Sequence, residues 1–495
     1  MNLQFNFPID NTAWFVTDAI NYKDFTKKNI NFLNNKNIIK EWEIVNLSLK
    51  SEDNFNNIEK WENYLKVNSL WEAIIADRRL SLNRLSKAFL SYDYVFSHEK
   101  LVSIIIRHCE EIDSIFRKFK PNIVFSFGPN TCGAVISGYM ARSYNIPFLT
   151  LKSTKISNFV SLSEDWKDNH IHIIKKFKEL KKKETYNPSA LKFAKHFLHS
   201  IQKDSSKAYE GNLNSKKIKT IKLFKQNSFK LIKSIFSDFN NFINGVNDLQ
   251  RPPQTSMHNQ LIFGKFFRKL TSKNIISQKL QSKKNLKKIK YVFFPLNSEP
   301  EIALSVYNFK FRNQIEICRI ISEALPLNYY LIVKEHPRSW GVRKSGYYKK
   351  LSKIPNLKFA KVDDNISDLI KNSAGVIVIS SFVAFQALVL NKPVALIGSS
   401  IYEMLGKPYI LKVENIFCLD KIIKELINLK INSRNILEKF VCSVYETCVP
   451  IDLYNKLLKK QDRSFGAGNK LTEGEKEQYQ KLANYAKKRF LEVSK

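Results

Sequence analysis

Several features are missing from this chain of 495 residues, and each absence excludes a class of protein. The six cysteines are scattered and form no Cys-x-x-Cys pair, which argues against a zinc site or a disulfide framework and suits a reducing cytoplasm. The opening stretch MNLQFNFPIDNTAWF has no basic leader followed by an apolar core, so we expect no signal peptide. The longest apolar run, Ala374–Leu390, is interrupted by two serines and a glutamine. A strand followed by a helix explains this run better than a membrane span.

Acidic residues are also in short supply. The chain has 45 Asp and Glu against 81 Lys and Arg, which gives a formal net charge of +36. Such an excess attracts polyanions, namely anionic lipid headgroups, nucleic acid or acidic polysaccharide. A genome biased towards Lys, Asn and Ile codons would produce the same composition without any such partner, and both explanations stay open. No nucleic-acid-binding motif is present, so we expect no specific nucleic acid partner.

The length predicts two or three domains, and a hydrophobic content of 44% is enough for large cores. We place the boundaries at 1–195 (an α/β region), 196–289 (a Lys-rich connector), 290–440 (a second α/β region) and 441–495 (terminal helices).

In the first region, a strand over Asn122–Phe127, a helix over Cys132–Tyr144 and a strand over Phe148–Leu151 form a Rossmann-like unit. Residues 151–165 are expected to be a polar loop. In the connector, Lys alternates with Ile, Leu and Phe over Lys216–Phe236, which is typical either of an interfacial helix or of a helix packed on a neighbouring domain.

Strands and helices alternate through the second α/β region, which predicts a parallel, doubly wound sheet. The predicted strands are Lys290–Leu296, Tyr329–Val333, Leu357–Val362, Gly375–Ile379 and Pro393–Ile397. The predicted helices between them are Arg312–Leu325, Ile366–Asn372 and Phe382–Leu390.

Ligands of such sheets bind outside the carboxyl ends of the strands, and two polar clusters fall there. Lys334-Glu335-His336-Pro337 follows the second strand, and Ser380-Ser381 follows the fourth. A histidine at this position can donate to a phosphate oxygen or protonate a leaving phosphate. Two serine hydroxyls and the free amides of the next helix can form an anion site, although an ordinary helix cap is the alternative.

The stretches YVFFPLNSEPE, LPLNYYLIVKEHPRSWGVRKSGYYKKLSKIPN and VIVISSFVAFQALVLNKPVALIG resemble the C-terminal half of bacterial capsule and surface polysaccharide biosynthesis proteins. This family includes Kdo transferases of the two-domain glycosyltransferase B fold. The resemblance implies that His336-Pro337 and Ser380-Ser381 hold the nucleotide phosphate, and that Glu299 or Glu301 matches an acidic residue after the first strand. Gln386 stands where the family commonly has a glutamate, and its amide can still bind a ribose hydroxyl. The expected donor-binding residues are Lys334, Glu335, Pro337, Arg338, Arg343, Ser380, Ser381, Gln386 and Tyr402.

We therefore expect two Rossmann-like domains, the first for an acceptor and the second for a nucleotide-sugar, with the terminal helices as candidates to cross back onto the first. The expected reaction transfers Kdo or a similar acidic sugar from a CMP-sugar to a surface polysaccharide or its lipid-linked acceptor. Catalytic candidates are His336 and Glu301 in the second domain and Asp10, Glu164 or Asp165 in the first. No metal and no cofactor besides the nucleotide-sugar are expected.

The expected location is the cytoplasm, peripherally on the inner face of the membrane. Two other functions stay open. One is a UDP-sugar 2-epimerase, which shares the fold, and the other is a non-catalytic basic protein that binds membrane or nucleic acid.

Overall fold

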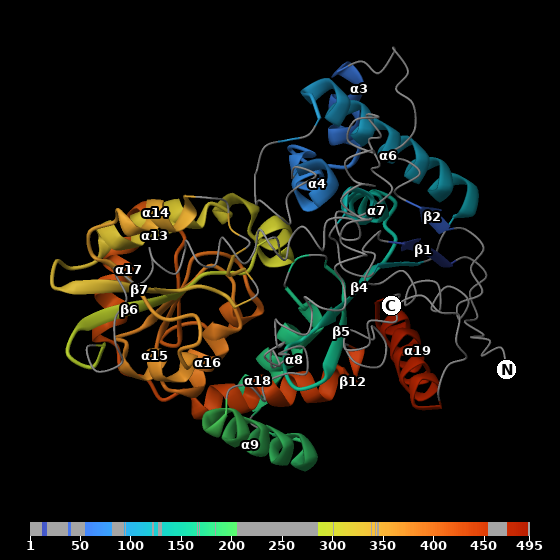
Figure 1. The fold of residues 1–495 in the computed structure, drawn as a ribbon. Coiled ribbons are helices and arrows are strands. Elements are labelled where there is room, and N and C mark those ends of the chain that lie inside the picture. The colour runs from blue at the N-terminus through green and yellow to red at the C-terminus, as the bar shows by residue number, and fades with distance from the viewer. Residues whose placement is uncertain are drawn as a thin grey trace, which may run out of the picture. The chain divides into compact units, whose positions relative to one another are not determined.

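The computed structural model divides into two compact units, each built around a six-stranded sheet (Figure 1). The first unit comprises residues 1–80, 96–212 and 435–495, and the second comprises 81–95 and 213–434. The structure describes residues 12–16, 38–40, 55–81, 94, 96–120, 123–126, 131–204 (except 166, 168 and 184), 286–453 (except 300, 338, 342, 344 and 345) and 473–493. Most of the predicted connector, including Lys216–Phe236, lies outside them.

The sheet of the first unit has the strand order β12-β5-β4-β3-β1-β2. Its strands are β1 (Thr12–Val16), β2 (Ile38–Lys40), β3 (Ile123–Ser126), β4 (Phe148–Ser153), β5 (Phe159–Ser163) and β12 (Val449–Pro450). The first four pair in parallel, whereas β5 is antiparallel to both of its neighbours. The helices of this part of the chain are α3 (Phe55–Tyr64), α4 (Trp71–Ala76), α5 (Arg78–Ser81), α6 (His98–Phe119), α7 (Cys132–Ser143), α8 (Ile171–Lys183), α9 (Pro188–Lys203), α18 (Arg434–Thr447) and α19 (Glu473–Val493).

The polar loop predicted over residues 151–165 is wrong, because β4 continues to Ser153 and β5 returns beside it. The loop was predicted because the serines and lysines of this stretch are typical of a solvated segment. In the fold its polar groups are satisfied internally: the buried Lys152 amine donates to the carbonyls of Asp165 and Lys167, and the Ser161 hydroxyl lies 2.9 Å from His170 Nδ1. The apolar residues of β5 meanwhile join the core.

The sheet of the second unit has the order β11-β10-β9-β6-β7-β8, with every pair parallel. Its strands are β6 (Lys290–Pro295), β7 (Tyr329–Lys334), β8 (Leu357–Phe359), β9 (Val376–Val378), β10 (Val394–Leu396) and β11 (Ile410–Lys412). Its helices are the π-helix η3 (Ala303–Tyr307), the 3-10 helices η4 (Phe309–Phe311), η5 (Ile401–Leu405) and η6 (Ile416–Cys418), and the α-helices α13 (Gln314–Ala324), α14 (Tyr347–Ser352), α15 (Ile366–Asn372), α16 (Val383–Val389) and α17 (Leu419–Asn428). The predicted doubly wound parallel sheet is confirmed. Its strand order reverses between β6 and β9, which is the position at which sheets of this kind bind ligands.

Two predicted boundaries fall inside helices. The boundary at residue 195 cuts α9, and the boundary at residue 440 cuts α18. The strand β11 has only three residues, too few to show a period in the sequence, and was not predicted. Among the described residues, no helix combines the length and the apolar character needed to span a membrane.

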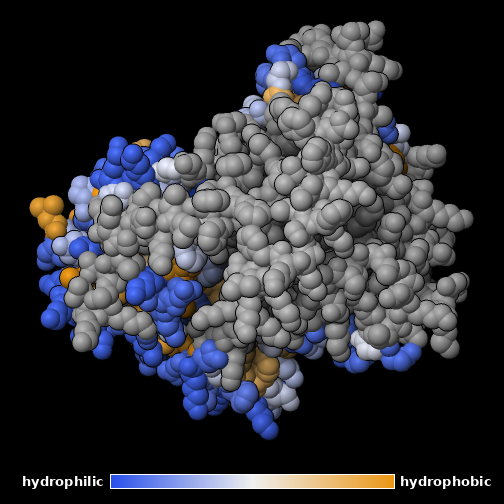
Figure 2. Space-filling model, in the orientation of Figure 1, coloured by the Kyte–Doolittle hydropathy of each residue, from blue (hydrophilic) through white to orange (hydrophobic). Residues whose placement is uncertain are grey.

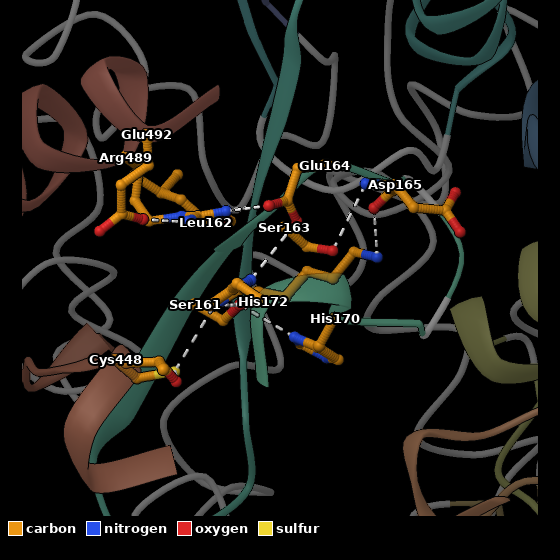
Figure 3. Close-up of polar contacts among 12 residues, drawn as sticks. Ser161, Leu162, Ser163, Glu164, Asp165, His170, His172, Cys448, Arg489 and Glu492 are labelled. Carbon is orange, nitrogen blue, oxygen red and sulfur yellow. Dashed lines mark hydrogen bonds and ion pairs between the residues drawn. The ribbon is translucent and has the colours of Figure 1, made fainter. Parts of the chain in front are cut away.

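The C-terminal helix α19 packs on the first unit through an ion pair and a buried tyrosine. Arg489 pairs with Glu164 at the end of β5, and its Nε donates to the carbonyl of Leu162 at 3.2 Å (Figure 3). The Tyr485 hydroxyl donates to the carbonyl of Thr447 at 2.9 Å. One of the terminal helices expected as candidates to cross back onto the first domain, α19, therefore holds one face against β5.

His172 of α8 lies in the same polar cluster. Its Nε2 is 3.4 Å from the Tyr485 hydroxyl and 3.2 Å from the Ser161 hydroxyl, and its Nδ1 is 3.4 Å from Glu164 Oε2 (Figure 3). Burial lowers the pKa of His172 to about 4, although the Glu164 carboxylate opposes the shift. Burial raises the pKa of Glu164, but the hydrogen bond from His172 and the charge of Arg489 outweigh it and lower that pKa to about 2.

These shifts predict that the first unit loses stability in mild acid. The folded protein keeps His172 neutral down to about pH 4, whereas the unfolded chain protonates it near its ordinary pKa of 6.5. The contribution of His172 to the free energy of unfolding is complete above pH 6.5. As the pH falls towards 4, this free energy decreases by about 3 kcal/mol. Urea denaturation followed by circular dichroism should show this loss between pH 7 and pH 4.5 in wild type, and His172→Gln should reduce it.

The exposed His199→Gln serves as the control and should keep the wild-type pH dependence. An unchanged pH dependence in His172→Gln would contradict the assignment.

Candidate functional site

A side-chain hydrogen bond joins the two loops at the strand-order reversal of the second unit. Asn297, just after β6, donates from its side-chain amide to the carbonyl of Ser380, just after β9, at 2.8 Å. Gln314 of α13 in turn accepts the Asn297 backbone N–H at 2.7 Å. The loop that carries the paired serines is therefore fixed against the loop that follows the central strand.

The loop after β7 is tied to the same place through Ser339. The Ser339 hydroxyl accepts the Glu299 N–H at 3.1 Å and lies 3.1 Å from the Ser298 hydroxyl. The Ser339 backbone N–H donates to the His336 carbonyl at 2.9 Å. Three loops thus meet at one sheet edge. Since β7 and β9 flank β6, their ends lie about 10 Å apart, a distance that a nucleoside phosphate can bridge.

A buried ion-pair cluster underlies these loops. The Arg343 guanidinium lies between two carboxylates, 2.6 Å from Glu299 and 2.8 Å from Glu335, and all three side chains are at most 4% exposed. Arg343 also donates to the Asn297 carbonyl at 2.7 Å, and the Tyr348 hydroxyl donates to Glu335 at 2.8 Å. Burial lowers the pKa of Arg343, but the charge of Glu335 and its other neighbours outweighs it and raises that pKa above its usual range.

The cluster also fixes the start of the histidine turn. Glu335 accepts the backbone N–H of His336 at 2.6 Å, and the turn closes through the Ser339–His336 hydrogen bond. His336 is half-buried and Pro337 is exposed, as expected for residues at the rim of a sheet. His336 remains the candidate to bind a phosphate oxygen or protonate a leaving group.

Two of the predicted donor-binding residues are buried away from the surface of the unit. Glu335 and Arg343 are bound to each other inside the unit, so the structure gives them a supporting position rather than a surface one. Lys334 is also buried, and burial lowers the pKa of its amine. Arg338 lies outside the described residues. Spacing along the chain could not separate these positions, because a buried ion pair and an exposed anion site use the same residue types.

The paired serines begin a short helix, as predicted. Ser381 accepts the Val383 N–H at 3.2 Å, and Ser380 is buried. Gln386 is buried within α16. Tyr402 is also buried, with its ring centroid 6.0 Å from that of Phe385, so it packs inside the unit. Binding roles for the serines and Gln386 stay predictions.

Of the catalytic candidates, Glu301 is half-buried just before η3. Asp10 lies outside the described residues. Glu164 is engaged by Arg489 and His172 in the α19 contact (Figure 3). Asp165 accepts the Lys167 N–H at 2.9 Å and the Asn169 side-chain amide at 2.6 Å.

Sequence reasoning missed Asn297, Gln314 and Ser339, which join the three loops. Asn297 could have been found, because it is the first polar residue after the first strand of the unit. Gln314 and Ser339 carry no local signal, since their partners are 17 and 40 residues away in the chain. Among the described residues, no group of three or more His, Cys, Asp or Glu side chains could hold a metal ion.

Strand order and loop placement define the second unit as a Rossmann-like α/β unit. Residues 254–413 match the model of the family described as capsule polysaccharide biosynthesis protein. The match encloses Tyr291–Gly398, so the resemblance inferred from the sequence is confirmed there. A search of curated proteins finds no match.

Solved structures with similar folds are distant. Two are from Thermosulfurimonas dismutans KpsC: the beta Kdo 2,7 transferase (14% identity, covering 71% of this chain and 88% of that one, TM-score 0.34) and the beta Kdo 2,4 transferase (13%, 65% and 79%, 0.36). Another is UDP-GlcNAc 2-epimerase from Neisseria meningitidis bound to UDP-GlcNAc (11%, 87% and 96%, TM-score 0.24). These TM-scores are too low to assign a function.

The ion-pair cluster predicts a strong asymmetry between two arginines. Arg343→Met leaves two buried carboxylates without a counter-charge and should lower the free energy of unfolding by about 3–5 kcal/mol. Arg319→Met removes two exposed ion pairs on α13 and should cost little, since solvent screens such pairs. Urea denaturation of both variants measures the difference, and equal losses would show that the cluster does not support the unit.

Proposed function

We propose that this protein is a glycosyltransferase that moves a sugar from a nucleotide-activated donor onto a capsule or surface polysaccharide, or onto its lipid-linked acceptor. The observation that carries this proposal is the hydrogen bond from Asn297 to Ser380. It joins the loop after β6 to the serine-bearing loop at the strand-order reversal of a parallel sheet, and Ser339 ties the histidine-bearing loop to the same place. The family match over residues 254–413 supports the same chemistry.

In this proposal the edge of the second unit binds the donor by its phosphate. The His336 imidazole donates to a phosphate oxygen and supplies a proton as the sugar–phosphate bond breaks. Ser380 and Ser381 hold the other side of the phosphate with hydroxyl and backbone N–H groups. Glu335 positions the turn at His336, because its carboxylate accepts the His336 N–H. Arg343 in turn holds the Glu335 carboxylate in place.

The favoured donor is a CMP-linked acidic sugar such as Kdo, as the sequence resemblance implies. The charge at this edge agrees with that choice. Lys334 and Arg343, two cations predicted to assist, are both buried, and Arg343 is already matched by carboxylates. A nucleoside monophosphate leaving group needs less neutralisation than a diphosphate does.

The acceptor is assigned to the first unit, and the protein to the cytoplasmic membrane surface where lipid-linked glycans are extended. Neither Glu164 nor Asp165 is proposed as the base, because both carboxylates are engaged within the first unit.

Thermal unfolding with CMP, UDP, GDP and ADP tests the donor site. A ligand at one hundred times its dissociation constant stabilises the folded state by about 2.7 kcal/mol, which raises the melting temperature by several degrees. We expect this shift with CMP in wild type and its loss in His336→Ala. The exposed His199→Ala on α9 should respond as wild type does.

A shift with UDP alone would keep the site but favour a UDP-sugar enzyme, with the 2-epimerase as the first alternative. No shift with any nucleotide would overturn the proposal. An equal CMP shift in wild type and His336→Ala would remove His336 from the site.

A further inference from the structure

Helix α9 of the first unit carries a stripe of lysine and histidine side chains opposite its buried face. The buried stripe consists of Ala190, Ala194, Phe197, Leu198 and Ile201. The exposed stripe consists of Lys192, His196, His199 and Lys203, at spacings of four, three and four residues. Position 192 lies two residues beyond 190 and thus about 200° around the helix, so the cationic stripe points away from the core.

The last turn of α8, which precedes α9 in the chain, is also basic. Lys181, Lys182 and Lys183 are exposed, and only residues 184–187 separate them from α9. We call these three lysines together with the α9 stripe the basic face. Helix α9 lies at the lower edge of the view in Figure 1, where Figure 2 shows hydrophilic side chains beside a few hydrophobic ones.

The basic face differs from other charged helix surfaces of the described chain in having few acidic neighbours. On α13, Arg319 is balanced by Glu316 and Glu323, and on α19, Lys481 is balanced by Glu477. Residues 185–203, in contrast, contain no Asp or Glu, although Glu184 and Asp204 flank them. Because lysines outnumber acidic residues here, part of the counter-charge is left to a partner.

We propose that the basic face binds the surface of an anionic phospholipid bilayer. The side chains favour this partner over other polyanions. The basic face contains no arginine, the residue that recognises individual phosphates through a two-pronged fork, and lysine instead provides diffuse point charges. The α9 aromatics are turned inward: Phe197 is buried, and Phe193 packs at 5.4 Å from Phe159 and 5.3 Å from Tyr445. No aromatic platform is therefore offered to stack on bases or sugar rings.

Because the basic side chains form a straight line along α9, they can contact a flat, charged surface together. With no large apolar side chain in the stripe to insert between lipids, binding is electrostatic and reversible, and it weakens as salt is added. The surface lies in the first unit and involves none of the residues proposed to bind nucleotide, so the two assignments stand or fall separately.

Co-sedimentation of the full chain with vesicles tests the proposal. The vesicles contain phosphatidylcholine alone or phosphatidylcholine mixed with phosphatidylglycerol. The test variant replaces Lys181, Lys182, Lys183, Lys192 and Lys203 with Gln. The matched control replaces five exposed lysines of the second unit, Lys349, Lys350, Lys421, Lys424 and Lys430, with Gln and thus removes the same charge.

We expect wild type and control to bind the anionic vesicles only, and the test variant to bind at least about tenfold more weakly. Circular dichroism confirms that both variants are folded. Equal weakening in both variants would overturn the proposal, since net charge alone would then explain binding. Absence of binding to anionic vesicles, with retention on dextran sulfate that the test variant loses, would also overturn it and assign the basic face to an acidic polysaccharide.

Discussion

One buried arginine organises the candidate site. Arg343 lies between Glu299 of one loop and Glu335 of the next, and it also binds the carbonyl of Asn297. Through these partners it holds the loops after β6 and β7, and through Asn297 it reaches the serine loop after β9. A charged group with so little solvent contact is tolerated only because its partners are placed around it. The loops that would bind a donor phosphate are therefore held by one electrostatic centre beneath them.

This arrangement separates support from chemistry along a single short motif. In Lys334-Glu335-His336-Pro337, the first two side chains are buried and the last two face the rim. In an extended strand, buried and exposed side chains would alternate, whereas here two buried residues are followed by two at the rim. The reason is that the strand ends at Lys334 and the chain turns at His336. The turn places the His336 imidazole at the rim of the sheet, while Glu335 holds the His336 backbone through a hydrogen bond.

The second unit could be predicted closely from sequence because its strands are apolar and separated by clear helices. β6 through β10 and their order of appearance follow from composition, as does the helix Ile366–Asn372. β5 could not be predicted, because its serines are satisfied by partners distant in the chain, such as His172. Residues at the candidate site were identified by position at strand ends, but sequence spacing alone could not show that Arg343 and Tyr402 are buried. Burial depends on tertiary contacts that spacing does not encode.

The path of the chain has a consequence for synthesis at the ribosome. The second unit ends at residue 434, whereas the first still requires β12 and α19 to complete its sheet edge and cover β5. Domains generally fold as units as they emerge, so the unit encoded in the middle of the gene can be finished first. The unit that begins the chain must wait for its last residues. Until then, the edge of β5 is an unpaired template of the kind that chaperones protect.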